Sequence, residues 1–296
     1  MKNYIYSDLA VEGIAEPGRE PGSKREYSEE DHGIAKVFRL DIRNKKLSEK
    51  YGRPRGKYVT VSCRRIWQLD GDELSAITGL VAGELRSMIK SMCGKEPDSG
   101  FSALVAGLGN SDITPDAIGP QTVKNMTVTR HIGALAPEVF GKLGQCSVSA
   151  VVPGVLAQTG IETVELIRGA AESVRPDIII AVDALAARSC ERLAATVQLS
   201  DNGISPGSGI GNMRKAINMD SIGVPVLALG VPTVVDSSTL VYDALGKAGI
   251  EKVDDELKKV LENGRGFFVS PKESDIICKS VAQMLAAAID ISLGVK

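Results

Sequence analysis

The chain contains short apolar runs and longer stretches in which apolar residues recur with a helical period. Apolar and polar residues alternate in 35–42 and again in 57–63, which predicts two strands. In 72–92 the apolar residues recur instead at every third or fourth position, which predicts an amphipathic helix. Asp70 or Asp72 is suited to cap the start of that helix, because an Asp side chain accepts hydrogen bonds from the first free amides.

Beyond residue 100 the pattern repeats a strand-then-helix order. Strands are predicted at 102–109, 147–154, 176–185, 194–200 and 224–232, and helices at 120–127, 162–174, 236–249 and 272–292. The run 176–185 is apolar almost throughout, which is typical of a central parallel strand buried on both faces. This order predicts an α/β fold with a mostly parallel or mixed sheet that helices cover on both faces.

The first 65 residues differ from the rest in composition. Residues 1–34 are polar and hold several Pro and Gly residues, so we expect an arm or pro-segment there, poorly packed against the core. Between Lys36 and Arg65, eleven basic residues stand against two acidic ones, a local net charge of 11 − 2 = +9. This hairpin-like segment, residues 35–65, is either a solvated face or a docking surface for an acidic partner or substrate.

Composition narrows the function classes. With 35 Lys and Arg against 37 Asp and Glu, the formal net charge is −2, which excludes the overall charge balance of a nucleic-acid-binding protein. The start of the chain has no apolar run typical of a signal peptide, and no stretch is apolar and long enough to span a membrane. Five cysteines, an odd number without a CxxC pair, indicate reduced thiols in the cytoplasm.

Only two histidines are present, His32 and His131, so a His-rich metal site and a Ser–His–Asp hydrolase are both improbable. Two Asp residues become the candidate catalytic groups. Asp116 lies in the glycine-rich loop after the strand at 102–109, and Asp183 follows a run of apolar residues. Ligands of such sheets bind beyond the carboxyl ends of the strands, so the two could form a pair that shares a proton. Such a pair supplies a general base and a general acid, although either Asp taken singly could equally cap a helix or turn.

Two glycine-rich loops are candidate substrate-binding elements. Their residues are Gly107, Gly109 and Asn110 in the first loop and Gly207, Gly209 and Gly211 in the second. Such loops can present backbone N–H groups to a substrate, and they can also simply make tight turns. Neither completes a dinucleotide-binding fingerprint. A nucleotide-binding or nucleoside-phosphorylase-like protein nevertheless stays open as an alternative enzyme class, and a non-enzymatic docking module as a third.

A series of ordered motifs resembles the germination protease (spore protease) family of spore-forming bacteria. They are GLGN and TPDAIGP within 107–120, TRH (129–131), VPGV (152–155), TGIET (159–163), IAVDALAARS (180–189), SPGSGIGN (205–212) and GVPTVVD (230–236). The match runs from about residue 102 to 240, and SDLAVE (7–12) extends it toward the N-terminus. The stretch between the helix at 236–249 and FFVSP (267–271) is shorter than in this family.

The resemblance implies an endopeptidase that initiates degradation of small acid-soluble spore proteins when a spore germinates. It implies an atypical aspartic peptidase with its essential carboxylates at Asp116 and Asp183 and with no metal or other cofactor. It further implies a three-layer α/β/α sandwich similar to the hydrogenase-maturation proteases, assembly as a homotetramer, and a place in the cytoplasm of the spore core. No membrane or direct nucleic-acid partner is expected.

The resemblance also implies a zymogen that processes itself near its N-terminus. Asp8, Leu9 and Ala10 resemble the family's substrate sites, in which an acidic residue precedes an apolar one and then Ala. We therefore expect cleavage between Asp8 and Leu9, which would divide the chain into a propeptide of residues 1–8 and a single peptidase domain of residues 9–296.

Overall fold

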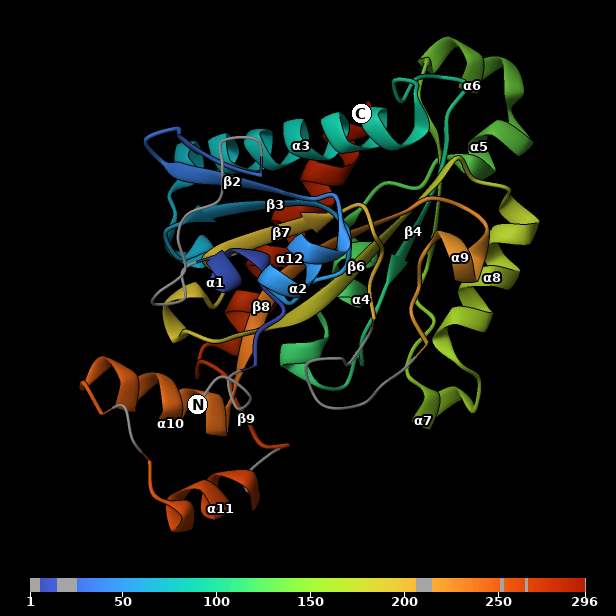
Figure 1. The fold of residues 1–296 in the computed structure, drawn as a ribbon. Coiled ribbons are helices and arrows are strands. Elements are labelled where there is room, and N and C mark those ends of the chain that lie inside the picture. The colour runs from blue at the N-terminus through green and yellow to red at the C-terminus, as the bar shows by residue number, and fades with distance from the viewer. Residues whose placement is uncertain (1–5, 15–25, 206–214, 251–252, 264–265, 296) are drawn as a thin grey trace.

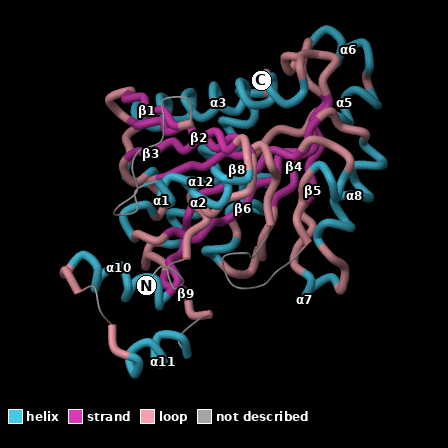
Figure 2. Tube along the Cα trace, in the orientation of Figure 1, coloured by secondary structure: helices cyan, strands magenta, loops and turns pink. Residues whose placement is uncertain are grey.

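A mixed β-sheet forms the centre of the molecule in this computed structural model, which describes residues 6–14, 26–205, 215–250, 253–263 and 266–295 (Figures 1 and 2). The strand order is β1-β2-β3-β7-β8-β6-β4-β5, and β9 pairs with β8. The strands are β1 (Tyr27–Asp31), β2 (Ala35–Ile42), β3 (Gly56–Cys63), β4 (Ser102–Gly107), β5 (Ser147–Val151), β6 (Ile178–Ala187), β7 (Thr196–Ser200), β8 (Val226–Asp236) and β9 (Phe268–Val269).

The sheet has a parallel half and an antiparallel half. Strands β8, β6, β4 and β5 run parallel to one another, while β1, β2, β3, β7 and β8 pair antiparallel in that order. The parallel half comes from the strand-then-helix order in the sequence, and the antiparallel half contains the basic segment 35–65. The expected hairpin there is confirmed, since β2 pairs along its whole length with β3.

The longer helices are α3 (Gly71–Cys93), α4 (Ile118–Asn125), α8 (Thr163–Val174), α10 (Ser237–Lys247), α11 (Asp255–Asn263) and α12 (Ser274–Ser292). The shorter ones are α1 (Ala10–Ile14), α2 (Lys45–Tyr51), α5 (Arg130–Leu135), α6 (Pro137–Leu143), α7 (Leu156–Thr159) and α9 (Met219–Ile222). Asp70 is the N-cap of α3 and forms a capping box with Glu73, so of the two candidate caps it is Asp70 that is used. Asp236 caps α10, as its position before that helix predicts.

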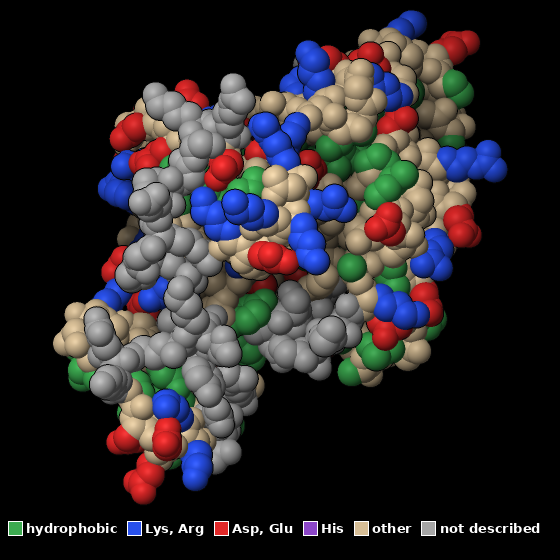
Figure 3. Space-filling view, viewed as in Figure 1, with side chains coloured by type: hydrophobic (Ala, Val, Ile, Leu, Met, Phe, Trp, Pro, Cys, Tyr) green, Lys and Arg blue, Asp and Glu red, His purple; other side chains and the backbone are tan. Residues whose placement is uncertain are grey.

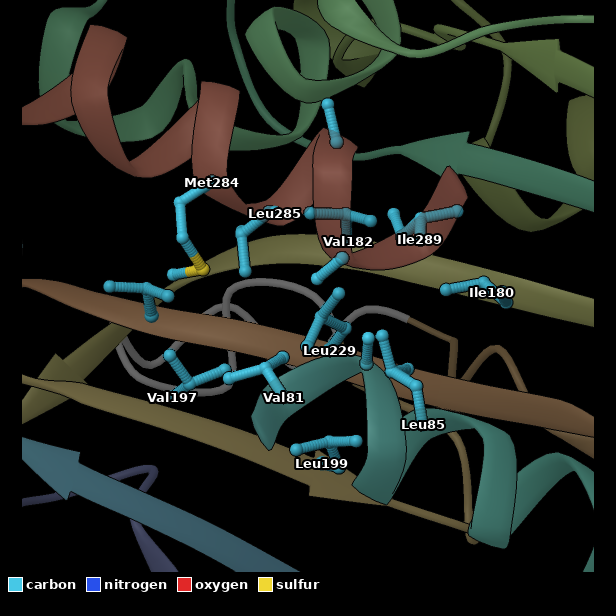
Figure 4. Close-up of a cluster of buried hydrophobic side chains, with 14 of the residues drawn as sticks. Val81, Leu85, Ile180, Val182, Val197, Leu199, Leu229, Met284, Leu285 and Ile289 are labelled. Atoms are coloured by element: carbon cyan, nitrogen blue, oxygen red, sulfur yellow. The ribbon is translucent and has the colours of Figure 1, made fainter. Parts of the chain in front are cut away.

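Helices cover both faces of the sheet. On one face α3, α4 and α12 pack on the strands, and this core includes Val182, Leu229 and Leu285 (Figure 4). On the other face α8 packs on β4 and β5, and its Ile167 belongs to a cluster with Leu104 of β4 and Ile179 of β6. Alternate residues of β4 and β6 point into these two clusters, as the period of a strand requires. The expected α/β sandwich with a mixed sheet is therefore confirmed.

The N-terminal segment differs from the expectation. Leu9 is 0% exposed, and Ala10 and Val11 are also buried, so the expectation of a poorly packed arm is wrong for this part of it. Leu9 and Val11 join Leu185, on β6, in a small apolar cluster of their own. The physical reason is that the three consecutive apolar side chains pack into two apolar clusters, Leu9 and Val11 in one and Ala10 in the other, although the surrounding sequence is polar.

The basic segment carries a helix that the sequence pattern does not reveal. Asn44 caps α2, and Gly52 ends it in the left-handed conformation that favours glycine. Lys and Arg side chains gather over the middle of the face in Figure 3, where Figure 1 places α2. Within the described parts of the chain, none of the helices is both long enough and apolar enough to cross a bilayer.

Candidate active site

Both predicted carboxylates line one cavity of about 390 Å³ at the carboxyl ends of the parallel strands. Asp116 and Asp183 are joined there by Asp8 from the N-terminal segment. The other lining residues are Leu108, Gly109, Ile113, Pro115, Gly154, Val155, Thr163, Ala184, Leu185, Ala186, Ile204, Ser205, Thr233, Val234, Phe268 and Ser270. Most of these side chains are apolar or small, so the three carboxylates have few charged neighbours among the lining residues.

Strand β6 positions Asp183. Its neighbour in the sheet on β8 is Gly230, and the residue before it, Val182, accepts a hydrogen bond from the amide of Leu108 at 2.8 Å. Asp183 is 6% exposed, and its Oδ1 accepts a hydrogen bond from the amide of Ala184 at 2.9 Å. The backbone of Asp183 is held by its pairing with β8, one residue past the end of the β4–β6 pairing.

A tight turn positions Asp116. The turn spans Thr114–Asp116, and the amide of Asp116 donates to the carbonyl oxygen of Ile113 at 2.8 Å. The amide of Asn110 donates to Asp116 Oδ2 at 2.7 Å. The predicted loop residue Asn110 therefore contributes its backbone to the carboxylate, and this amide stabilises the ionised form of the carboxyl group.

The first glycine-rich loop is needed for close packing. A Cβ on Gly109, whose φ is +108°, would clash with the carbonyl oxygen of Asp116. A Cβ on Gly107 would collide with the backbone of Gly119, and one on Gly119 would clash with the Leu108 backbone and lie 2.5 Å from the carbonyl oxygen of Val182. The absence of side chains lets the Asp116 loop lie directly against β6 at Val182, the residue before Asp183.

The second glycine-rich loop cannot be placed, because Gly207, Gly209 and Gly211 lie outside the described residues. Ser205, just before them, lines the cavity. Within the described residues, no group of three or more His, Cys, Asp or Glu side chains could hold a metal ion.

The N-terminal segment reaches the cavity through Asp8. The amide of Asp8 donates to the carbonyl oxygen of Ala186 at 2.8 Å, and the amide of Ala186 donates back to Asp8 Oδ2 at 2.8 Å. The hydroxyl of Tyr6 donates to the other carboxylate oxygen. Gln198 Nε2 donates to the carbonyl oxygen of Asp8 at 2.9 Å. Asp8 is thus fixed along β6, three residues past Asp183.

The chain matches a known family over most of its length. The family described as germination protease matches residues 20–248. The chain belongs to the germination protease family. It is therefore a peptidase, a hydrolase of the atypical aspartic class to which that family belongs, and it acts in spore germination.

Individual relatives agree with the family match. The germination protease of Caldanaerobacter subterraneus subsp. tengcongensis is 40% identical over 98% of this chain and 94% of its own length. That of Clostridium perfringens (strain ATCC 13124) is 37% identical over 98% and 95%. The Priestia megaterium germination protease is 43% identical over 80% of this chain and 63% of the relative. Family membership decides against both the nucleotide-binding and the docking-module alternatives.

One residue of this germination protease that sequence reasoning missed is Thr233, on β8. Its hydroxyl donates to the carbonyl oxygen of Pro115, the residue before Asp116, at 2.7 Å. The GVPTVVD motif (230–236) contains Thr233, but the motif does not show which way a strand side chain points. The apolar lining residues Ile113, Val155 and Phe268 were also missed, since apolar residues near a site look like any others in a sequence.

Proposed function

We propose that this germination protease is an endopeptidase that initiates degradation of small acid-soluble spore proteins, with Asp116 and Asp183 as its catalytic carboxylates. The observation that carries the proposal is that both carboxylates, from separate elements, line one largely apolar cavity. A cavity of about 390 Å³ has room for several residues of an extended peptide between walls that include Ile113 and Phe268.

The two carboxylates divide the acid and base work. The ionised one takes a proton from a water molecule while the water oxygen bonds to the carbonyl carbon of the scissile peptide. The protonated one gives its proton toward the leaving nitrogen, and the carbon–nitrogen bond breaks to yield a carboxylic acid and an amine. Two carboxyl groups in one site favour holding a single proton between them, because both cannot ionise without repulsion.

The test is cleavage of a purified small acid-soluble spore protein by Asp116→Asn and Asp183→Asn. Each variant keeps the shape of the side chain but cannot complete the acid–base pair, so we expect at least a 100-fold loss of kcat. Asp112→Asn is the matched control: Asp112 lies in the same loop, is exposed and does not line the cavity. Wild-type activity in either of the first two variants would remove that residue from the mechanism.

No metal or cofactor is part of the proposal. Wild-type cleavage should therefore persist in excess chelator. Loss of cleavage in chelator, restored by a divalent ion, would contradict the proposed mechanism and favour a metallopeptidase.

We also propose that the protein is made as a zymogen that cuts itself between Asp8 and Leu9. Asp8 lines the cavity, which supports the idea, but Leu9 is fully buried. The segment must therefore leave its present position before the bond can meet the two carboxylates. Purified protein held at mildly acidic pH should lose residues 1–8 by intact mass, and Asp183→Asn should not. A different new N-terminus would refute the assignment.

The oligomeric state and the location of the protein are also proposals. Assembly as a homotetramer has a candidate surface on α5 and α6, where Leu135 at the end of α5 and Val139 and Leu143 of α6 are exposed. Light scattering at working concentration checks it, and a monomer would contradict it. We also propose that the protein acts in the cytoplasm of the spore core and has no membrane partner and no direct nucleic-acid partner.

A further inference from the structure

We propose that Thr233 is a positioning residue that fixes Asp116 relative to Asp183. The inference deepens the proposed function and rests on the two carboxylates as a catalytic pair. Thr233 touches neither carboxylate in the described contacts. It acts through the backbone of the turn that carries Asp116.

Thr233 is an extra residue in its strand. Along the β6–β8 pair, Leu185 stands opposite Pro232 and Ala186 opposite Val234, so Thr233 has no partner in the register. Such a bulge bends the strand and changes where a side chain points, and bulges are frequent beside active sites. The residue before it is anchored from the segment that leads into β7, where the amide of Ala194 donates to the carbonyl oxygen of Pro232 at 2.8 Å.

The bulge directs the hydroxyl of Thr233 to the Asp116 turn. Thr233 is 4% exposed, and its Oγ1 donates to the carbonyl oxygen of Pro115 at 2.7 Å. Because Pro115 is bonded directly to Asp116, holding this carbonyl fixes the start of the residue that carries the carboxylate. The hydrogen bond is nearly shielded from water, so no solvent molecule readily takes the place of the hydroxyl.

The same strand holds the other carboxylate. Gly230, three residues before Thr233 on β8, is the register partner of Asp183. One continuous stretch of β8 therefore contacts both halves of the site, one through strand pairing and one through a side chain. Strand β8 therefore helps to set the separation of the two carboxylates, and the Thr233 hydroxyl supplies a side-chain hydrogen bond from β8 to the Asp116 turn.

The test compares Thr233→Val with Thr233→Ser. Valine keeps the shape but removes the hydroxyl, and serine keeps the hydroxyl. We expect Thr233→Val to lower kcat by about 10- to 100-fold, the scale of a misplaced reacting group, with little change in KM. Thr233→Ser should restore most of the wild-type kcat. Thr78→Val is the matched control, because Thr78 also donates from a buried hydroxyl to a backbone carbonyl, that of Leu74 at 2.6 Å, but in α3.

A pH profile separates positioning from general stability. Two carboxyl groups that repel each other titrate with apparent pKa values that lie apart, and a looser turn weakens that repulsion. The bell-shaped profile of Thr233→Val should therefore be narrower than that of the wild type. Asp8 is the other carboxylate among the described lining residues, so all variants are compared in the same processing state, checked by intact mass.

The outcomes are distinct. Wild-type kcat and pH profile in Thr233→Val, or an equal loss in Thr233→Ser, would overturn the positioning role. Wild-type activity in Asp116→Asn would instead overturn the proposed function on which the positioning role rests. If Thr233→Val does not fold, Thr233→Ala carries the same comparison, since it removes the hydroxyl without adding a second methyl group.

Discussion

Gly119→Ala should damage both the fold and the site, although it adds a single methyl group. The added Cβ would lie 2.5 Å from the carbonyl oxygen of Val182 and clash with the backbone of Leu108. These are backbone atoms, so no side chain can rotate away. The same atoms form the hydrogen bond from the Leu108 amide to the Val182 carbonyl, which joins β4 to β6 at 2.8 Å.

The expected size follows from that geometry. Overpacking a well-filled site costs about 1–3 kcal/mol, and the loss of the strained hydrogen bond adds about 1 kcal/mol. We therefore expect the free energy of unfolding to fall by about 2–4 kcal/mol in urea denaturation. Because Asp183 follows Val182 directly, peptide cleavage should fall more steeply than the folded fraction does.

Gly83→Ala is the matched control. Gly83 lies inside α3, where an added Cβ would meet nothing within 4 Å. Replacing glycine by alanine in a helix interior stabilises by about 0.5–1 kcal/mol, so this variant should be at least as stable as the wild type and fully active. Equal stability and activity in Gly119→Ala and Gly83→Ala would refute the close approach of the Asp116 loop to β6.

Two further changes test other parts of the molecule. Burial raises the pKa of the Asp290 carboxyl, and a hydrogen bond from the Thr127 amide partly opposes this shift. Folding therefore favours the protonated carboxyl. The stability that the protonated form contributes is lost as pH rises through the folded pKa. Asp290→Asn should therefore raise Tm near neutral pH and lose that advantage in acid, and a gain that is equal at both pH values would contradict this cause. Leu9→Ala removes a fully buried side chain and should weaken docking of the N-terminal segment by about 2–5 kcal/mol. Hydrogen exchange at the Ala10 amide, which donates to Gln198 Oε1 at 2.6 Å, should then speed up, and unchanged exchange would show that Leu9 does not hold the segment.

Sequence periodicity predicts the regular elements well because their hydrophobic faces meet one continuous core. The apolar run of 176–185 becomes β6, buried on both faces, and the pattern of 72–92 becomes α3. Helix α2 was missed because its short, basic sequence has little apolar periodicity and depends on the caps Asn44 and Gly52. The burial of Leu9 was missed because it depends on packing against Leu185 and Val235, which are distant in the sequence.

Some features of the candidate site could be predicted from the sequence, and others could not. That Asp116 and Asp183 line one cavity could be predicted, since ligands of such sheets bind near the carboxyl ends of the parallel strands. Thr233 could not, because a bulge exists only relative to the partner strand, and nothing in GVPTVVD (230–236) marks which residue is the extra one. The direction of a hydroxyl near a site therefore needs the register of two strands as well as the sequence of one.

The N-terminal segment shows how burial bears on the proposed self-processing. Asp8 lines the cavity, while Leu9, on the other side of the proposed cut, lies fully inside an apolar cluster. Glu12 anchors the same segment further along, where its carboxylate accepts hydrogen bonds from the amides of Arg188 at 2.8 Å and Ser189 at 3.2 Å. The boundary between residues 8 and 9 thus separates a cavity-lining residue from the core. Asp8 is itself held along β6 by hydrogen bonds with Ala186 and Gln198, so a cut between residues 8 and 9 opens the cavity only if these hydrogen bonds also break.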